Sequence, residues 1–472
     1  MQRQRLDTDQ KALEINLNDR VYGTFAEIGA GQEVARIFFK VGAAAGTIAK
    51  TMSAYDKTFS DKIYGQEESG RYVCEHRLYK MLDHEYDLLY TRLKEKLPDH
   101  LFFVFADTIA ALNYQRTVAG HGWLGVRFQL DSNSEPNDFV VHARMLDNDA
   151  QLQQSAIGVL GVNMVYAAFN HNEDLTDLVS SLHDGIKERV RIDLIRLTGP
   201  HFRETDNRLI CLRMIQLGLT DVTMFDVAGQ PIHASEFLYR KALMVVRGHF
   251  RPPTLVTRDV FRISFEQFKS QQATDPSQCE LMAELTLDYL KEDGKISDED
   301  FLARSTMLCA SNQKVIVSNC TNHVALIDYL ADFKIQHLSL VIGVRELAQL
   351  ITQKYEEHVD GMLLSEFGRL FAKNLTVYAY PALANDLKSL ITLERLPIPP
   401  GIEFLVRFLV ENSLIIPVDN YNQEILSIIP HNVYQMIQTG EKGWEQFVPK
   451  DLAEIIQSDH LFGFRESRDS NE

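Results

Sequence analysis

From about residue 159 onward, short runs of Val, Ile and Leu alternate with segments whose apolar residues recur at three- to four-residue spacing. The short runs predict buried strands, and the spaced pattern predicts amphipathic helices. A repeat of strand, loop and helix is typical of βα units, whose crossover helices make neighbouring strands parallel. The predicted strands are 162–169, 192–197, 221–225, 242–246, 281–287, 314–317, 338–342 and 376–380, and the predicted helices between them are 207–217, 259–269, 298–309, 323–333 and 345–357.

This pattern predicts an α/β fold with parallel βα repeats. Eight units that start roughly 20 to 40 residues apart suit a closed (β/α)8 barrel, which we favour slightly. The same pattern with one misassigned strand suits an open, doubly wound sheet. Both arrangements place ligands at the carboxyl ends of the strands, so the expected position of a site does not depend on the choice.

The chain before these repeats has a different pattern. Strands are predicted at 101–105, 123–129 and 139–144, and the turn-rich link 131–137 suggests that the last two form an antiparallel hairpin. Amphipathic helices are predicted at 74–96 and 27–40. Because single cores stop growing near about 250 to 300 residues, a chain of 472 residues should form several domains. We expect an α+β lobe at 1–150, a βα-repeat domain at 151–400 and a mainly helical extension at 401–472.

Composition narrows the functional classes. The net charge of −17 disfavours nucleic acid as a partner, because it repels a phosphate backbone. The most apolar stretch, 156–169, is shorter than the ~20 residues that cross a bilayer, and the polar N-terminus does not resemble a signal peptide. Five scattered cysteines without a CxxC pair suit reduced thiols. We therefore expect a cytoplasmic protein with no membrane partner, and no motif indicates a metal or a particular cofactor.

A glycine-rich turn lies near the N-terminus, where a short apolar run meets Gly29 and Gly31 and a helix is predicted to follow. The first N–H groups of a helix lack partners and the helix dipole favours an anion, so such a turn can bind phosphate. The alternative, which we favour, is that both glycines only permit a tight turn or close packing.

Three partial family resemblances involve this turn. Glu27-Ile-Gly-Ala-Gly31 resembles the glycine loop of S-adenosylmethionine-dependent methyltransferases, with Glu33 where a third glycine would fall. Gly23-Thr-Phe25 resembles the opening of the nicotinate-nucleotide adenylyltransferase signature, although the HxGH element and its two histidines are missing from the residues that follow. Together with 361–371 and 377–381, the stretch 22–40 resembles a poorly characterised bacterial family that carries the adenylyltransferase name. The resemblance implies nucleotidyl transfer in NAD metabolism.

A duplicated basic loop is the strongest candidate site. Gly199-Pro-His-Phe-Arg203 follows one predicted strand, and Arg247-Gly-His-Phe-Arg-Pro252 follows another. If both strands belong to one sheet or barrel, the two loops lie on the same face. Arginine forks hold phosphate or carboxylate, and histidine moves protons near neutral pH. The candidate catalytic residues are His201, His249 and Asp206, and the candidate anion ligands are Arg203, Arg208, Arg247 and Arg251, with Gly29 and Gly31 from the N-terminal turn.

The leading hypothesis is a cytosolic enzyme, a transferase if it is an enzyme, acting on a phosphorylated small molecule or nucleotide. GxSxG, HExxH and GxxxxGK[ST] motifs do not occur, which removes the main support for other common chemistries. The rival hypothesis is a non-catalytic interaction or scaffold protein whose arginines form structural salt bridges. Under the leading hypothesis, alanine at Arg203 or Arg247 abolishes the thermal shift that a ligand causes and leaves the stability of the unliganded protein almost intact. His121, which lies between two glycines, is a secondary catalytic candidate.

Overall fold

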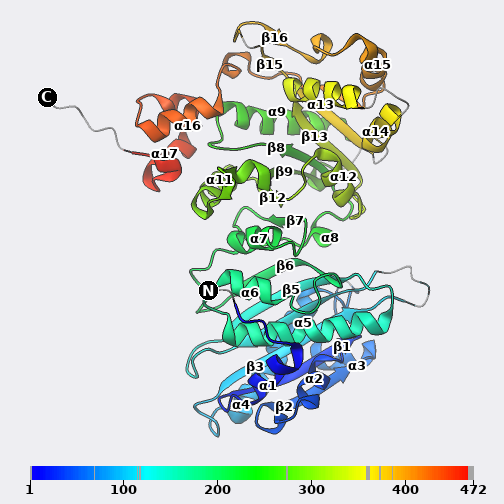
Figure 1. Ribbon diagram of the computed structural model, residues 1–472, viewed down its shortest axis with the longest axis vertical. Helices are drawn as coiled ribbons and strands as arrows, with labels where there is room; N and C mark the ends of the chain where they lie inside the picture. Colours follow the sequence, from blue (N-terminus) through cyan, green and yellow to red (C-terminus); the bar gives the residue numbers. More distant parts are fainter. Residues whose placement is uncertain are drawn as a thin grey trace, which may run out of the picture. The chain divides into compact units, whose positions relative to one another are not determined.

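The computed structural model describes residues 3–465 except 69, 114, 116–118, 273–274, 358–361, 372–373 and 385. The chain divides into two compact units, Met1–Thr223 (unit 1) and Met224–Glu472 (unit 2). Each unit combines helices with a sheet that contains parallel strands, which confirms the α/β class (Figure 1). The division falls well after the expected boundary at residue 150, because residues 150–198 contribute two helices and a strand to the first unit.

The sheet of unit 1 has six strands in the order β2-β1-β3-β4-β5-β6. Strands β1 and β2 and strands β1 and β3 pair in parallel, while β3 to β6 form an antiparallel meander that includes the predicted hairpin. The strands are β1 (Val21–Gly29), β2 (Ile48–Ala54), β3 (Leu101–Ala110), β4 (His121–Phe128), β5 (Asn137–Met145) and β6 (Val190–Thr198).

Helices cover both faces of this sheet (Figure 1). Phe103 and Phe105 of β3 pack in a core with α5, whereas Phe102 and Val104 pack in a second core with α4. Burial on both faces explains why the sequence of β3 is a continuous apolar run and not an alternating one. The helices of unit 1 are α1 (Thr8–Asn16), α2 (Val34–Lys40), α3 (Lys57–Tyr64), α4 (Glu75–Leu93), α5 (Ala150–Asn170), α6 (Leu175–Ser181) and α7 (Asn207–Gln216).

Two predictions in this region are wrong. Residues 162–169 were expected to form a strand but lie inside α5, and residues 27–40 were expected to be one helix but contain the end of β1, the glycine turn and α2. Helix α5 is buried along most of its length, so its apolar residues surround the axis and show no helical periodicity. A short apolar run of this kind does not distinguish a buried helix from a buried strand.

The sheet of unit 2 is open and doubly wound. Its order is β17-β14-β13-β8-β9-β12-β7, and among the described residues its two outer strands do not pair with each other. Starting from β8, the chain adds β9 and β12 on one side and then β13, β14 and β17 on the other, with parallel pairing throughout. The strands are β7 (Val222–Phe225), in which the division between the units falls, β8 (Ala242–Arg247), β9 (Cys279–Thr286), β12 (Lys314–Ser318), β13 (His337–Gly343), β14 (Leu375–Tyr380) and β17 (Ile415–Pro417).

The barrel that we favoured slightly is therefore not the arrangement observed. One of its eight expected strands is a helix, and another, β6, belongs to the sheet of unit 1. From β8 onward the six parallel strands have the order 3-2-1-4-5-6 of dinucleotide-binding sheets when numbered along the chain. In such sheets ligands bind where the strand order reverses, which here is between β8 and β13.

The C-terminal part of the chain belongs to unit 2. Helices α16 and α17 and the turn between them share one apolar core with α11, which includes Met307, Ile437, Trp444 and Ile456. No described helix of either unit is long and apolar enough to cross a membrane. Two-residue strands form the hairpins β10 (Lys291–Glu292) with β11 (Lys295–Ile296) and β15 (Ala382–Leu383) with β16 (Leu390–Ile391). The helices of unit 2 are α8 (Ala234–Phe237), α9 (Leu255–Gln271), α10 (Leu287–Leu290), α11 (Asp298–Ala310), α12 (His323–Ala331), α13 (Val344–Glu357), α14 (Met362–Phe371), α15 (Glu403–Glu411), α16 (Pro430–Thr439) and α17 (Lys450–Ser458).

Candidate functional site

A cavity of about 770 Å³ lies in unit 2 at the point where the strand order reverses. Its walls come from the carboxyl ends of β8, β13 and β14, from the first turns of α9 and α13, and from the segment 426–434. The volume is within the range of about 300 to 1,000 Å³ that small-molecule sites occupy. Apolar side chains form much of the wall, among them Val246, Val256, Val260, Val341, Leu383, Leu426, Ile428 and Ile429.

The second of the two predicted basic loops lines this cavity, but its arginines form ion pairs with glutamate and aspartate side chains. Arg247 donates from Nε to Glu284 Oε2 at 2.7 Å and from Nη2 to Glu284 Oε1 at 2.9 Å. Arg251 pairs with Glu292 and Asp300, both at 2.7 Å. Burial alone would lower the pKa of Arg247, but the hydrogen bonds and charge of Glu284 outweigh it and raise that pKa. Both arginines thus fix the loop, as the structural alternative predicted.

Arg345 differs from these two arginines. It begins the helix after β13, lines the cavity and donates to the backbone carbonyl of Leu383. Within the part of the chain that the structure describes, no carboxylate pairs with its guanidinium. Its charge is therefore available to a ligand in the cavity. Sequence reasoning missed Arg345, although its position directly after the predicted strand 338–342 is the signal that identifies strand-end ligands in such sheets.

Two titratable groups face the same cavity. Burial, followed by the charge of Arg304, lowers the pKa of His249, so its imidazole is neutral at neutral pH. Glu346 follows Arg345 on α13, and the surrounding protein raises its pKa by disfavouring the charged form, against the attraction of Arg247. Water still reaches Glu346 from the cavity. A carboxyl group with a raised pKa and a neutral histidine in one cavity can each hold or move a proton near neutral pH.

The first predicted loop is not part of this cavity. His201 and Arg203 follow β6 in unit 1, whereas His249 follows β8 in unit 2, so the two loops do not share the carboxyl edge of one sheet. Both side chains of the first loop are exposed. The expectation that both loops lie on one face of one sheet is therefore wrong, because similar local sequences follow strands of different sheets.

Asp206 and Arg208 in the first loop act on each other. Asp206 is the N-cap of α7 and accepts from the backbone N–H of Arg208 at 2.9 Å, and the guanidinium of Arg208 lies 2.6 Å from the same carboxylate.

We expect Asp206→Ala to lower the free energy of unfolding by about 1 kcal/mol, because the helix loses its cap. Asp206→Asn should lower it much less, because asparagine also caps helices. Arg203→Ala should change the free energy of unfolding by less than about 0.5 kcal/mol, because the Arg203 side chain is exposed. Urea unfolding measures the stability of all three variants. If Asp206→Ala does not change the free energy of unfolding, the capping role is contradicted.

The N-terminal glycines are required by close packing. Gly29 has φ +79°, and a Cβ atom there would lie 2.2 Å from the carbonyl oxygen of Ile109. A Cβ atom on Gly31 would lie 2.2 Å from Asp107 Oδ1. The N–H groups of Val34 and Ala35, at the start of the next helix, donate to the carboxylate of Glu27 at 3.0 and 3.2 Å. Glu27 thus occupies the position at which a phosphate was expected, and the structural alternative that we favoured accounts for both glycines.

Glu27 and Asp107 form a buried pair of carboxyl groups beside this turn. They lie opposite each other on the parallel strands β1 and β3, and Asp107 is fully buried. Burial raises the pKa of Glu27 to about 7. Burial and then the charge of Glu27 raise the pKa of Asp107 well above its ordinary value. Two adjacent carboxylates cannot both ionise cheaply in such a site, so the pair retains a proton to higher pH than isolated acids do.

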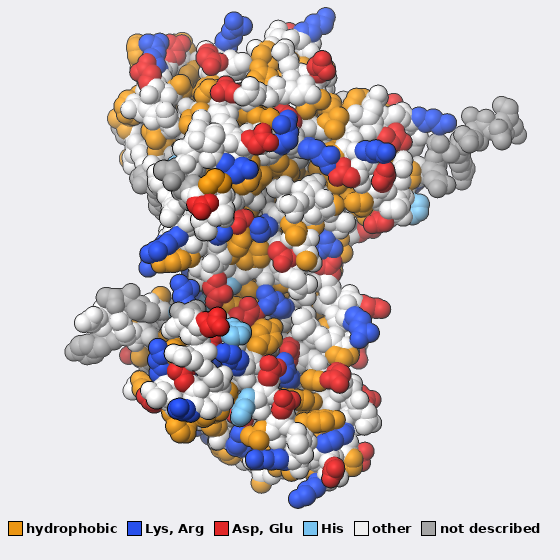
Figure 2. Space-filling model, turned by 180° about the vertical axis from the view of Figure 1, so that it is seen from behind, with side chains coloured by type: hydrophobic (Ala, Val, Ile, Leu, Met, Phe, Trp, Pro, Cys, Tyr) orange, Lys and Arg blue, Asp and Glu red, His pale blue; other side chains and the backbone are white. Residues whose placement is uncertain are grey.

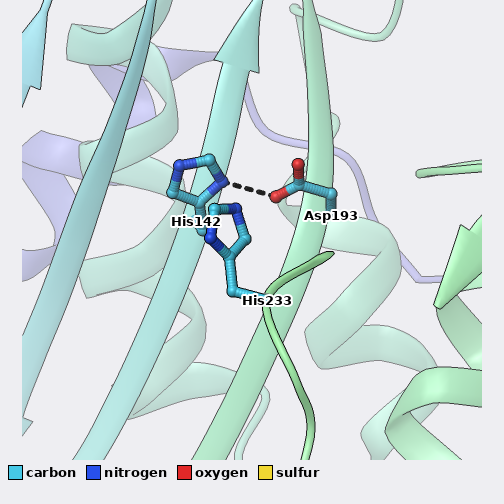
Figure 3. Close-up of side chains that lie close together, drawn as sticks. All are labelled: His142, Asp193 and His233. Carbon is cyan, nitrogen blue, oxygen red and sulfur yellow. Dashed lines mark hydrogen bonds and ion pairs between the residues drawn. The ribbon is translucent and has the colours of Figure 1, made fainter. Parts of the chain in front are cut away.

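A hydrogen-bonded row of side chains crosses β4, β5 and β6 of unit 1. His142 Nδ1 lies 2.5 Å from Asp193 Oδ1 (Figure 3), and Arg144 Nε donates to Asp193 Oδ2 at 2.8 Å. His142 Nε2 is 3.3 Å from His121 Nδ1. These contacts favour a His142 that donates to Asp193 and accepts from His121. Burial and His142 lower the pKa of His121, the secondary candidate, to about 4, so this histidine is neutral at neutral pH.

The face shown in Figure 2 carries basic and acidic side chains intermixed. Among its described residues there is no continuous basic surface of the kind that tracks a phosphate backbone.

Comparisons with protein-family profiles and with curated protein sequences gave no match. Solved structures with partial similarity include the competence/damage-inducible protein CihA from Agrobacterium tumefaciens, at 16% identity and TM-score 0.25, over 36% of this chain and 96% of that one. A competence or damage-inducible protein from Enterobacter asburiae gives 14% identity and TM-score 0.26 over 35% and 99%. Similarity at this level assigns neither fold nor function. The proposals below therefore depend on the cavity and the side chains around it.

Proposed function

We propose that unit 2 binds a nucleotide or another phosphorylated small molecule in the cavity at the carboxyl ends of β8, β13 and β14. The observation that carries this proposal is the position of the cavity, at the reversal point of a sheet with strand order 3-2-1-4-5-6. Ligands of doubly wound sheets bind at that point because the loops on either side diverge there and leave a crevice.

The charged lining supports an anionic ligand. Arg345 offers a guanidinium that is not neutralised by a described carboxylate, and guanidinium groups bind phosphate oxygens in pairs. Val256 and Thr257 place the first turn of α9 on the cavity wall, where the helix dipole also favours negative charge. Arg345 therefore takes the role that sequence reasoning gave to Arg247 and Arg251.

The cavity also contains groups suited to proton transfer, namely Glu346 and His249. An enzyme of this kind would be a transferase that acts on a nucleotide, and the N-terminal resemblance implies nucleotidyl transfer in NAD metabolism. The same cavity also suits the rival role, a scaffold protein that binds an anion without reaction. The acid partners of Arg247 and Arg251 favour that rival, because they show loop arginines in a structural role.

A thermal-shift screen with NAD, ATP, nicotinate mononucleotide, S-adenosylmethionine and sugar phosphates tests the proposal. At a hundred times its dissociation constant, a ligand should stabilise the protein by about 2.7 kcal/mol. Val260→Trp should abolish the shift by filling the cavity from α9, and Arg345→Met should weaken it by removing the cation.

Val324→Trp and Arg395→Met are matched controls, because both residues lie in unit 2 and neither lines the cavity. Both controls should keep the full shift. A shift that survives Val260→Trp would show that the ligand binds elsewhere. The absence of a shift with every phosphorylated ligand would refute the proposal itself.

A further inference from the structure

The wall of the cavity contains a flat aromatic pair. The rings of His249 and Tyr289 have centroids 3.9 Å apart and planes inclined by only 14°, so they stack. His249 comes from the loop after β8, and Tyr289 comes from α10, directly after β9. Both side chains line the cavity, and the structure leaves His249 exposed to solvent and Tyr289 half-buried.

The backbone on both sides of this pair is held by one buried arginine. Arg304 Nη1 donates to the carbonyl oxygen of His249 at 3.1 Å and to that of Tyr289 at 2.7 Å. Its guanidinium also pairs with Asp300 at 2.5 Å, and its side chain is almost fully buried. The backbone that carries both rings is thus held in place before a ligand arrives, which reduces the conformational entropy that binding would cost.

Phe250 adds to this rigidity. Its backbone adopts φ +47°, a left-handed conformation that is unusual for a bulky residue, while its ring is buried against Phe261. Strained backbone of this kind persists only where surrounding packing holds it, and it concentrates at ligand sites. The loop that carries His249 therefore has one defined shape.

A carboxyl group lines the same cavity as the aromatic pair. The charge of Glu346 is close enough to Tyr289 to contribute to the raised pKa of its hydroxyl, after the larger effect of burial. A carboxyl group in the same cavity as the stacked rings can bind N–H groups of a heterocycle. One cavity therefore contains apolar walls, a flat aromatic surface, a carboxyl group that can accept hydrogen bonds, and a cation.

We propose that the occupant of the cavity is a nucleotide whose base stacks on the His249 and Tyr289 pair while its phosphate binds Arg345. This inference rests on the proposed function and narrows it, because a sugar phosphate without a base would use only Arg345. Stacking of a base on an aromatic side chain contributes about 1 to 3 kcal/mol, which corresponds to roughly five- to 150-fold in affinity.

Titration calorimetry with AMP and with ribose 5-phosphate tests the inference on the full chain. We expect AMP to bind the unsubstituted protein roughly five- to 150-fold more tightly than ribose 5-phosphate does. Tyr289→Leu and His249→Leu should each reduce the affinity for AMP and leave that for ribose 5-phosphate nearly unchanged. Tyr289→Phe keeps the ring and should keep the affinity, and Tyr329→Leu, outside the cavity, is the matched control.

The outcomes separate this inference from the proposed function. Equal affinities for AMP and ribose 5-phosphate, both lost in Val260→Trp, would overturn base stacking and retain the phosphate site. Binding of neither compound would count against both proposals. If Tyr289→Leu does not fold, the AMP to ribose 5-phosphate ratio of the unsubstituted protein and of His249→Leu decides.

Discussion

Replacing Arg247 by leucine should lower the free energy of unfolding by about 3 to 5 kcal/mol in the absence of any ligand. The guanidinium of Arg247 is the bidentate partner of Glu284, whose side chain is completely buried and also accepts a hydrogen bond from Ser318 Oγ at 2.6 Å. Removing the cation leaves a carboxylate buried without its counter-charge. Urea unfolding followed by circular dichroism measures the loss.

Two controls distinguish this effect from a general sensitivity of the cavity. Arg345→Leu removes a guanidinium from the same cavity without exposing a buried acid, and it should cost far less. The double substitution Arg247→Leu with Glu284→Leu should recover most of the stability, because a buried ion pair is often no more stabilising than apolar residues of similar volume. If Arg247→Leu alone leaves the free energy of unfolding unchanged, Arg247 is not needed for stability. That result would support the prediction from sequence that this arginine binds a ligand.

Asp107→Asn should make unit 1 more stable at alkaline pH and flatten its stability profile. Burial raises the pKa of Glu27 from 4.5 to about 7 and raises the pKa of Asp107 well above 3.8. The folded state therefore binds protons that the unfolded chain has already lost. Stability is greatest below the unfolded pKa values and falls as pH rises toward the folded ones, by about 1.4 kcal/mol per pH unit for each such proton.

The substitution removes one of these titrations and also the repulsion that Asp107 exerts on Glu27. Thermal unfolding between pH 4.5 and 8 should therefore show a smaller decline for Asp107→Asn than for the unsubstituted chain. Asp99→Asn is the matched control, because Asp99 is exposed in a loop and should leave the profile unchanged. A profile of equal slope in Asp107→Asn would mean that Asp107 is ionised in the folded protein throughout this range.

Local pattern was a good guide where a short run of β-branched apolar residues is bounded by turn residues. The strands 242–246, 314–317 and 338–342 all lie within observed strands, and β4 and β5 form the expected antiparallel hairpin. Periodicity failed for α5, which is buried on nearly all sides. Helical periodicity is absent from that sequence because α5 presents almost no face to solvent, so polar residues do not recur along it.

The candidate site was predicted in part. The loop from Arg247 to Pro252 does line the cavity, because it follows a strand at the point where the sheet reverses direction. The similar loop near His201 does not, because its strand pairs in the sheet of unit 1. Strand pairing depends on contacts between residues far apart in sequence, and a single sequence does not display them.

The sequence by itself determined the α/β class, the position of most strands and the presence of arginine and histidine after β8, because these depend on local periodicity and residue type. Only the tertiary structure decided the open sheet in place of a barrel, the division near residue 223, and which arginines pair with a carboxylate. Arg247 is neutralised by an acid 37 positions away, whereas Arg345 meets no described carboxylate. Charge available to a ligand is thus a property of spatial neighbours, which the order of residues does not specify.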